Sequence, residues 1–110
     1  MMAVQPASID GVFRVLADPT RRAVFERLAR GGETSVVDLT AYAGVSQPAV
    51  SQHLKALRSA GLVSERRAGR NAYYRAETRQ LAPLVDWVAR QDLFWRTALG
   101  RLSDLLKEIE

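Results

Sequence analysis

The chain has 110 residues, with 16 Lys or Arg and 12 Asp or Glu, so its formal net charge is +4. This length predicts one domain with a modest hydrophobic core, and for so small a core we expect dimerisation. The absence of Cys excludes disulfides, thiolate metal sites and cysteine nucleophiles, and the single His, His53, cannot form a two-His metal site within one chain.

Neither a membrane span nor a signal peptide is expected. The sequence contains no run of about 18 apolar residues. Residues 1–10 lack the basic and apolar stretches of a signal peptide. We therefore expect a cytoplasmic protein with no membrane partner.

Two helices are predicted in the first third of the chain. Ser8 is the expected N-cap of a helix over residues 9–17, whose apolar positions recur at helical spacing. Asp18 and Pro19 suit the N-cap and first turn of a second helix, which Gly31 and Gly32 end.

Residues 35–60 have the spacing of a helix-turn-helix. Ser35 is the expected cap of a third helix over residues 36–43, and Gly44 can end it in the left-handed conformation. Ser46 then caps a fourth helix that has Pro48 in its first turn and continues through Ala60. Two helices joined by about three residues around a glycine are typical of this motif.

Residues 62–67 and 71–76 are predicted to pair as a two-stranded hairpin around a turn at Gly69. A ribbon of two strands is marginally stable alone, so it must pack on the helices. Side chains alternate between the two faces of a strand. We therefore expect one of Tyr73 and Tyr74 to pack on the helices and the other to be exposed.

Residues 78–109 predict a long C-terminal helix whose apolar positions recur at steps of three and four. Its apolar surface exceeds the need of a small core, so we expect a dimer interface. Pro83 and Gly100 argue against an ideal coiled coil and allow a bend or break between Gln91 and Phe94. The residues expected at the interface are Val12, Phe13, Leu84, Val88, Trp95, Leu99, Leu102 and Leu106.

Positive charge is concentrated in the middle of the chain. Residues 46–79 hold seven Lys or Arg and two Glu, a net charge of +5, whereas the remaining residues sum to −1. Such a cluster is what neutralisation of DNA phosphates requires. A solvated face of arginines is the alternative interpretation.

The fourth predicted helix can place polar groups against DNA. Its apolar residues Val50, Leu54 and Leu57 share one face, which leaves amides and hydroxyls for base edges and cations for phosphates on the other. An arginine at the tip of the hairpin can enter a minor groove or bind its phosphates. The candidate DNA-binding residues are Ser46, Gln47, Ser51, Gln52, His53, Lys55 and Arg58 on the helix and Arg66, Arg67 and Arg70 on the hairpin.

His53 and the polar helix face have simpler interpretations as well. His53 lies beside the apolar face, so it can contact a DNA phosphate or serve a structural role. The serines and glutamines can merely solvate an amphipathic helix. No glycine-rich phosphate loop and no pairing of a nucleophile with a base is present, so we expect no enzyme activity and no cofactor.

Three stretches together resemble the ArsR/SmtB family of bacterial winged-helix repressors. They are residues 15–22 (VLADPTRR), residues 46–57 (SQPAVSQHLKAL) with 60–63 (AGLV), and residues 67–70 (RAGR) with the pair at 74–75 (YR). The resemblance implies a single, mainly α winged helix-turn-helix domain over residues 1–110, with a small β-hairpin. In it, residues 35–60 are the helix-turn-helix, residues 62–76 the wing, and residues 9–17 and 78–109 the dimerisation helices.

The resemblance also implies a function. A homodimer would place two reading helices in successive major grooves of a pseudo-palindromic operator. It would repress transcription, often of its own operon, until an effector relieves the repression. The partners expected are thus double-stranded operator DNA and a second copy of the chain.

The chain departs from the family at its known metal sites. Many members carry a Cys motif on the third helix, where this chain has residues 35–39 (SVVDL), and the last predicted helix contains no His. We therefore expect a metal-independent repressor, controlled by its own concentration or by a small organic effector. Trp87, Phe94 and Trp95 would line an apolar cavity of the dimer for that effector, or belong only to the core.

Two rival functions remain open at the level of sequence. One is a protein-interaction module that binds its partner through the amphipathic C-terminal helix. The other is a non-specific nucleic-acid binder.

Overall fold

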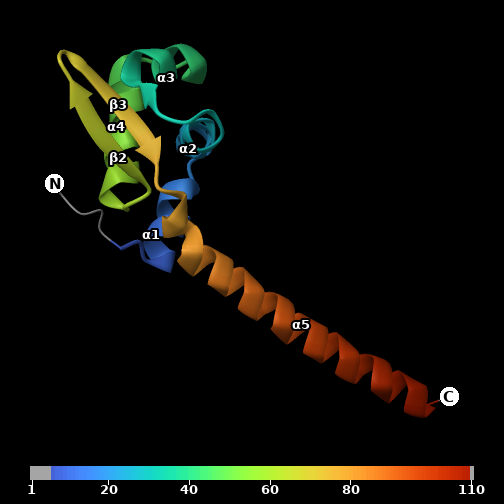
Figure 1. Ribbon diagram of the computed structural model, residues 1–110. Coiled ribbons are helices and arrows are strands. Elements are labelled where there is room, and N and C mark those ends of the chain that lie inside the picture. Colours follow the sequence, from blue (N-terminus) through green and yellow to red (C-terminus); the bar gives the residue numbers. More distant parts are fainter. Residues whose placement is uncertain (1–5, 110) are drawn as a thin grey trace.

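The computed structural model describes residues 6–109 and is mainly helical (Figure 1). Its helices are α1 (Ile9–Leu16), α2 (Pro19–Gly31), α3 (Val36–Ala43), α4 (Gln47–Ser59) and α5 (Ala82–Ile109), with a 3₁₀ turn at Thr78–Leu81 before α5. Its strands are β1 (Thr34–Ser35), β2 (Val63–Ala68) and β3 (Asn71–Ala76). The winged helix-turn-helix predicted from the sequence is confirmed.

The first four helices begin at the side-chain caps that the sequence predicts. In each, the cap side chain accepts a hydrogen bond from the backbone N–H three residues later, and such a cap contributes about 1 kcal/mol. The caps are Ser8, Asp18, Ser35 and Ser46. Gly44 has φ of +68°, the left-handed conformation that lets α3 end and α4 start shortly afterwards.

The sheet has three antiparallel strands in the order β1-β3-β2, not the two that the sequence predicts. Thr34 and Ser35 pair with β3, and a segment of two residues is too short to show an alternating pattern. β2 and β3 are joined by the two-residue turn Gly69-Arg70, in which Gly69 has φ of +62°. Only the first of the two turn residues has a positive φ, which is the pattern of a type II′ turn.

The core lies between α1, α2, α3, α4 and the base of the wing. The buried apolar residues are Val12, Val15, Val24, Phe25, Leu28, Leu39, Val50, Leu54, Leu57, Leu62 and Val63. Val12 is 0% exposed, so its expected place in a dimer interface is wrong. Its side chain fills the core of its own protomer and has no surface to offer a partner.

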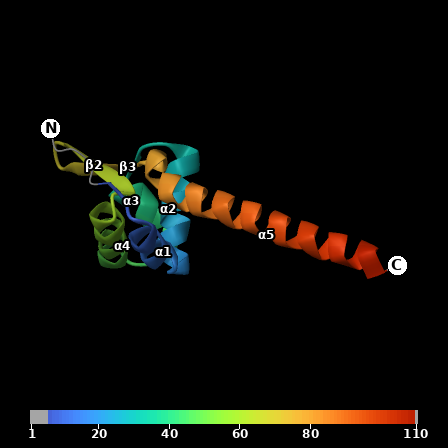
Figure 2. The ribbon, with the colours of Figure 1, turned by 90° about the horizontal axis from the view of Figure 1, so that it is seen from below.

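Helix α5 is continuous from Ala82 to Ile109, and the break allowed between Gln91 and Phe94 does not occur. Pro83 lies in the first turn, where a helix tolerates proline. Beyond its contact with α1, α5 projects away from the body of the protein (Figures 1 and 2). The described chain is accordingly elongated, with extents of 72 × 32 × 21 Å.

Candidate nucleic-acid interface

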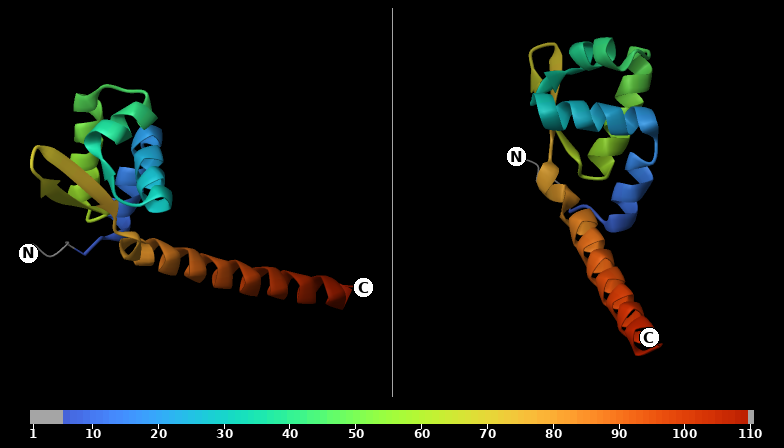
Figure 3. Two further views of the ribbon diagram at one scale, coloured as in Figure 1. Left: turned by 45° about the horizontal axis from the view of Figure 1, so that its top comes forward. Right: turned by 90° about the vertical axis from the view of Figure 1, so that its right-hand side faces the viewer.

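The sheet and α4 lie on the side of the domain away from the projecting part of α5 (Figure 3). On α4, Val50, Leu54 and Leu57 are 0% exposed and fix the helix to the core. Its outward face carries exposed hydroxyl, amide and basic side chains, which suit base edges and phosphates in a major groove. They are Ser46, Gln47, Ser51, Gln52, Lys55 and Arg58.

His53 is half-buried between α4 and the start of α2. The Arg21 Nε–H donates to His53 Nδ1 over 3.4 Å, so the neutral ring carries its proton on Nε2. Asp18, the cap of α2, accepts from the backbone N–H of Arg21, and this hydrogen bond lowers the pKa of the Asp18 carboxyl. Arg21 was not predicted as a neighbour of the site, because its partner lies 32 residues away.

Arg70 lies at the tip of the wing and is exposed. Like the side chain of Lys55 on α4, its side chain forms no hydrogen bond or ion pair with the rest of residues 6–109. Both side chains are therefore free to bind phosphates.

Arg66, expected to contact DNA, is bound within the protein. Its Nε and Nη2 donate to the Glu33 carboxylate over 2.6 to 3.2 Å. Its guanidinium carbon lies 4.7 Å from the ring centre of Tyr73, its partner across the strands, so Tyr73 is covered instead of fully exposed. The hydrogen bond from Arg66 lowers the pKa of Glu33.

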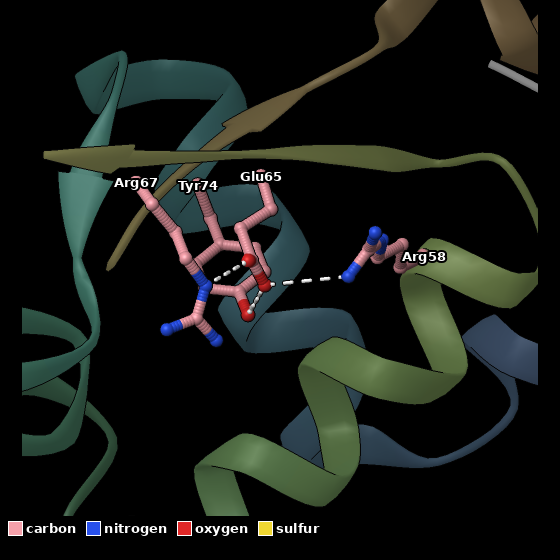
Figure 4. A network of polar contacts seen from close by, with 4 residues as sticks. All are labelled: Arg58, Glu65, Arg67 and Tyr74. Atoms are coloured by element: carbon pink, nitrogen blue, oxygen red, sulfur yellow. Dashed lines mark hydrogen bonds and ion pairs between the residues drawn. The ribbon is translucent and has the colours of Figure 1, made fainter. Parts of the chain in front are cut away.

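A second carboxylate, Glu65, joins the wing to α4 (Figure 4). It accepts the hydroxyl of Tyr74 at 2.5 Å, Arg67 Nε at 2.8 Å and Arg58 Nη1 at 3.4 Å. The hydrogen bond from Tyr74 lowers the pKa of Glu65, whereas burial and the carboxylate raise the pKa of Tyr74 to about 12. We call these four residues the Glu65 cluster.

Sequence reasoning missed Glu65 as a member of the site, because its partners depend on the register of the two strands. The predicted hairpin left the register of its strands open, and the two-residue turn of the structure places Glu65 opposite Tyr74. Residues directly opposite in an antiparallel pair lie within reach of each other. Tyr74 also packs on the core, as expected for one of the two tyrosines.

An apolar face without cover runs along α1 and α5. Phe13 and Trp87 meet edge to face with ring centres 5.4 Å apart, and Leu84 is half-buried against the core. The other expected interface residues of α5 are between 52% and 60% exposed: Val88, Trp95, Leu99, Leu102 and Leu106. These side chains are accessible to a second copy of the chain.

Two further features concern metals and membranes. Residues 6–109 contain no group of three or more His, Cys, Asp or Glu that could hold a metal ion. Within the same residues, no helix has the length and hydropathy needed to cross a bilayer.

An exposed polar helix in a helix-turn-helix, flanked by a basic β-ribbon, defines a winged helix-turn-helix DNA-binding protein. The comparisons with known proteins agree. Residues 18–65 match the family model described as bacterial regulatory protein, arsR family.

Relatives cover most of the chain. It is 45% identical over 101 residues to the HTH-type transcriptional regulator Rv2034 of Mycobacterium tuberculosis, and the match spans 90% of this chain and 89% of the relative. It is 32% identical over 80 residues to the transcriptional repressor SdpR of Bacillus subtilis, and that match spans 73% of this chain and 88% of the relative.

Among solved structures, it is similar to a homodimeric winged helix-turn-helix DNA-binding domain from Mycobacterium bovis, a possible ArsR-family regulator. The TM-score is 0.61 and the identity 34%, over 77% of this chain and 81% of that chain. The chain belongs to the ArsR family, and it is a DNA-binding transcriptional repressor and not an enzyme.

Proposed function

We propose that the protein represses transcription as a homodimer bound to a pseudo-palindromic promoter operator, that of its own gene included, and that it does so without a metal. One observation carries the proposal. The polar face of α4 and the wing lie together at one side of the protomer, while α1 and α5 leave an apolar face open.

The DNA contacts divide by chemistry. Gln47 and Gln52 can each pair with an adenine edge through two hydrogen bonds, so these side chains carry base preference. Lys55 and Arg70 have no partner among residues 6–109 and supply phosphate contacts. Each protomer in this way covers one half-site, and a two-fold dimer requires a site with matching symmetry.

The apolar face of α5 supports the homodimer. A row of exposed Leu and Trp side chains on one helix is rare on a monomer and typical of an interface. The similar domain from Mycobacterium bovis is homodimeric. Pairing α1 and α5 with their copies would leave both α4 helices outside the interface.

The side chains present support regulation without a metal. The chain has no Cys, and its one His already accepts a hydrogen bond from Arg21. We propose control by the protein's own concentration. A small organic effector is the second candidate, favoured by the aromatic side chains of Phe94 and Trp95, which lie exposed on α5.

Titration with DNA at several salt concentrations tests the proposal. The protein should bind the DNA upstream of its own gene more tightly than random DNA, and added Zn²⁺ or a chelator should leave this affinity unchanged. Equal weak binding to both DNAs would support the non-specific binder instead, and no binding to either would support the interaction module. Release by Zn²⁺ would refute metal independence.

A further inference from the structure

We propose that Glu65 is a positioning residue for DNA binding: it orients Arg58 of α4 and Arg67 of the wing so that both present unused N–H groups to the DNA backbone. This inference rests on the proposed function. It assigns a role to a carboxylate that, by charge alone, is unfavourable beside phosphates.

Glu65 is a fixed anchor within the Glu65 cluster. Its side chain is 12% exposed, and the hydroxyl of Tyr74, which packs on the core, donates to it. The carboxylate therefore has a defined place against the body of the domain. A flexible carboxylate at the surface could not orient its partners in this way.

The two arginines keep donors to spare. A guanidinium carries five N–H groups, and Arg67 contacts Glu65 through Nε while Arg58 uses one Nη1. Their side chains are 75% and 48% exposed. In Figure 4 the terminal nitrogens of Arg67 point away from the carboxylate. Each guanidinium can thus hold Glu65 on one side and a phosphate on another.

Arg66 shows the contrasting arrangement. It faces Glu33 with two of its nitrogens and is stacked on Tyr73, on the opposite face of the sheet from Glu65. The guanidinium of Arg66 is therefore engaged by contacts within the protein. In the Glu65 cluster, by contrast, one carboxylate connects cations from two different elements, and this fixes the wing relative to α4.

The Glu65 carboxylate has two opposite effects on DNA affinity: it orients the arginines, and its negative charge repels phosphates. This opposition makes the proposal testable. Removing the carboxylate removes a repulsion that any phosphate feels, so non-specific affinity should stay equal or rise. Without the carboxylate, Arg58 and Arg67 are no longer oriented, and this weakens only the docked arrangement in which α4 and the wing bind together. The ratio of specific to non-specific affinity therefore separates the two effects.

The first experiment compares Glu65→Gln with the wild type on promoter DNA and on random DNA. We expect the affinity ratio to fall roughly tenfold, which corresponds to about 1.4 kcal/mol. Glu77→Gln is the matched control, because it makes the same charge change at a carboxylate whose hydrogen-bond partners, Ser64 and Arg75, both belong to the wing. Its ratio should match that of the wild type.

A double-variant cycle tests whether Glu65 acts through Arg67. In the Arg67→Ala background, Glu65→Gln should change the ratio less than it does in the wild type. An equal gain in affinity for both DNAs, or the same loss of ratio in both backgrounds, would overturn the proposal.

A measurement without DNA keeps the two proposals apart. The changes in melting temperature caused by Glu65→Gln and Tyr74→Phe should be non-additive, since Tyr74→Phe removes the hydrogen bond that Glu65→Gln weakens by taking away the charge of the acceptor. Additive changes would show that the anchor is absent and refute the role of Glu65. Non-additive changes in a protein that does not prefer its promoter would refute the proposed function and, with it, the role of Glu65 in that function.

Discussion

Arg70 offers the sharpest prediction about phosphate binding. It lies in the two-residue turn of the wing, exposed and without a partner among residues 6–109. Replacing it by Ala removes one cation and disturbs no hydrogen bond or ion pair of the folded domain. We expect Arg70→Ala to weaken binding to all DNA sequences by a similar factor.

The size of the change in salt dependence follows from the number of Arg70 side chains in the dimer. Removing one phosphate contact reduces the slope of log affinity against log salt concentration by about 0.9. In a homodimer the substitution removes two such contacts, so the slope should flatten by about 1.8. The ratio of the wild-type affinity for DNA to that of Arg70→Ala should consequently shrink by about tenfold when the salt concentration rises about fourfold.

Fluorescence anisotropy over this salt range, with promoter and random DNA, measures both slopes. Arg101→Ala is a suitable control, because it removes the same charge from an exposed position in the C-terminal half of α5, a helix that projects away from the wing (Figure 1). Its slope should equal that of the wild type. If Arg70→Ala also leaves the slope unchanged, Arg70 does not bind phosphate and the assignment of the wing tip is wrong.

Four more predictions concern bases, dimerisation, stability and pH. Gln47→Ala and Gln52→Ala should each relax preference at particular base pairs, by about 1–3 kcal/mol, and uniform weakening over all sequences in a selection assay would contradict base contact. Leu99→Glu should give a folded monomer in sedimentation, because a carboxylate in an apolar interface is costly; a stable dimer would exclude this face of α5. Ser46→Ala should lower the free energy of unfolding in urea by about 1 kcal/mol, since it removes the cap of α4, and an unchanged value would show that the cap is dispensable. The pKa of Glu65 is lowered from 4.5, chiefly by the hydrogen bond from its tyrosine partner, so its contribution to stability is present above pH 4.5 and disappears as the pH falls through the lowered pKa. The melting temperature of Glu65→Gln should therefore fall less than that of the wild type on acidification. Parallel curves of melting temperature against pH would count against the hydrogen bond between Tyr74 and Glu65.

Most of the fold was predictable because its signals are local. A cap such as Ser46, a glycine such as Gly44 and the apolar spacing of α4 act within a few residues, and the structure reproduces all three. Strand β1 was not predictable, because its pairing with β3 joins residues about forty positions apart. The continuity of α5 also escaped, since Pro83 and Gly100 lower helix propensity without deciding the outcome.

The candidate site was predictable in its residue types but not in their pairing. Composition places basic residues on α4 and the wing, yet it treats all arginines alike. Only the three-dimensional arrangement gives Arg66 a partner at Glu33 and His53 a partner at Arg21. Val12 illustrates the same limit: its spacing fits an interface as well as a core, and packing within the protomer decides for the core.

The partners of the wing arginines determine how much of the positive charge reaches DNA. Arg66 has its nitrogens on Glu33, Arg67 shares one edge with Glu65, and Arg70 has no partner among residues 6–109. Releasing Arg66 to a phosphate would break an existing ion pair, so its net gain on binding is smaller than that of Arg70. The salt dependence of binding should therefore be less steep than the number of basic residues in the interface suggests. An arginine such as Arg66, with its donors directed to the protein, holds the wing in shape, whereas arginines with N–H groups to spare provide the attraction to DNA.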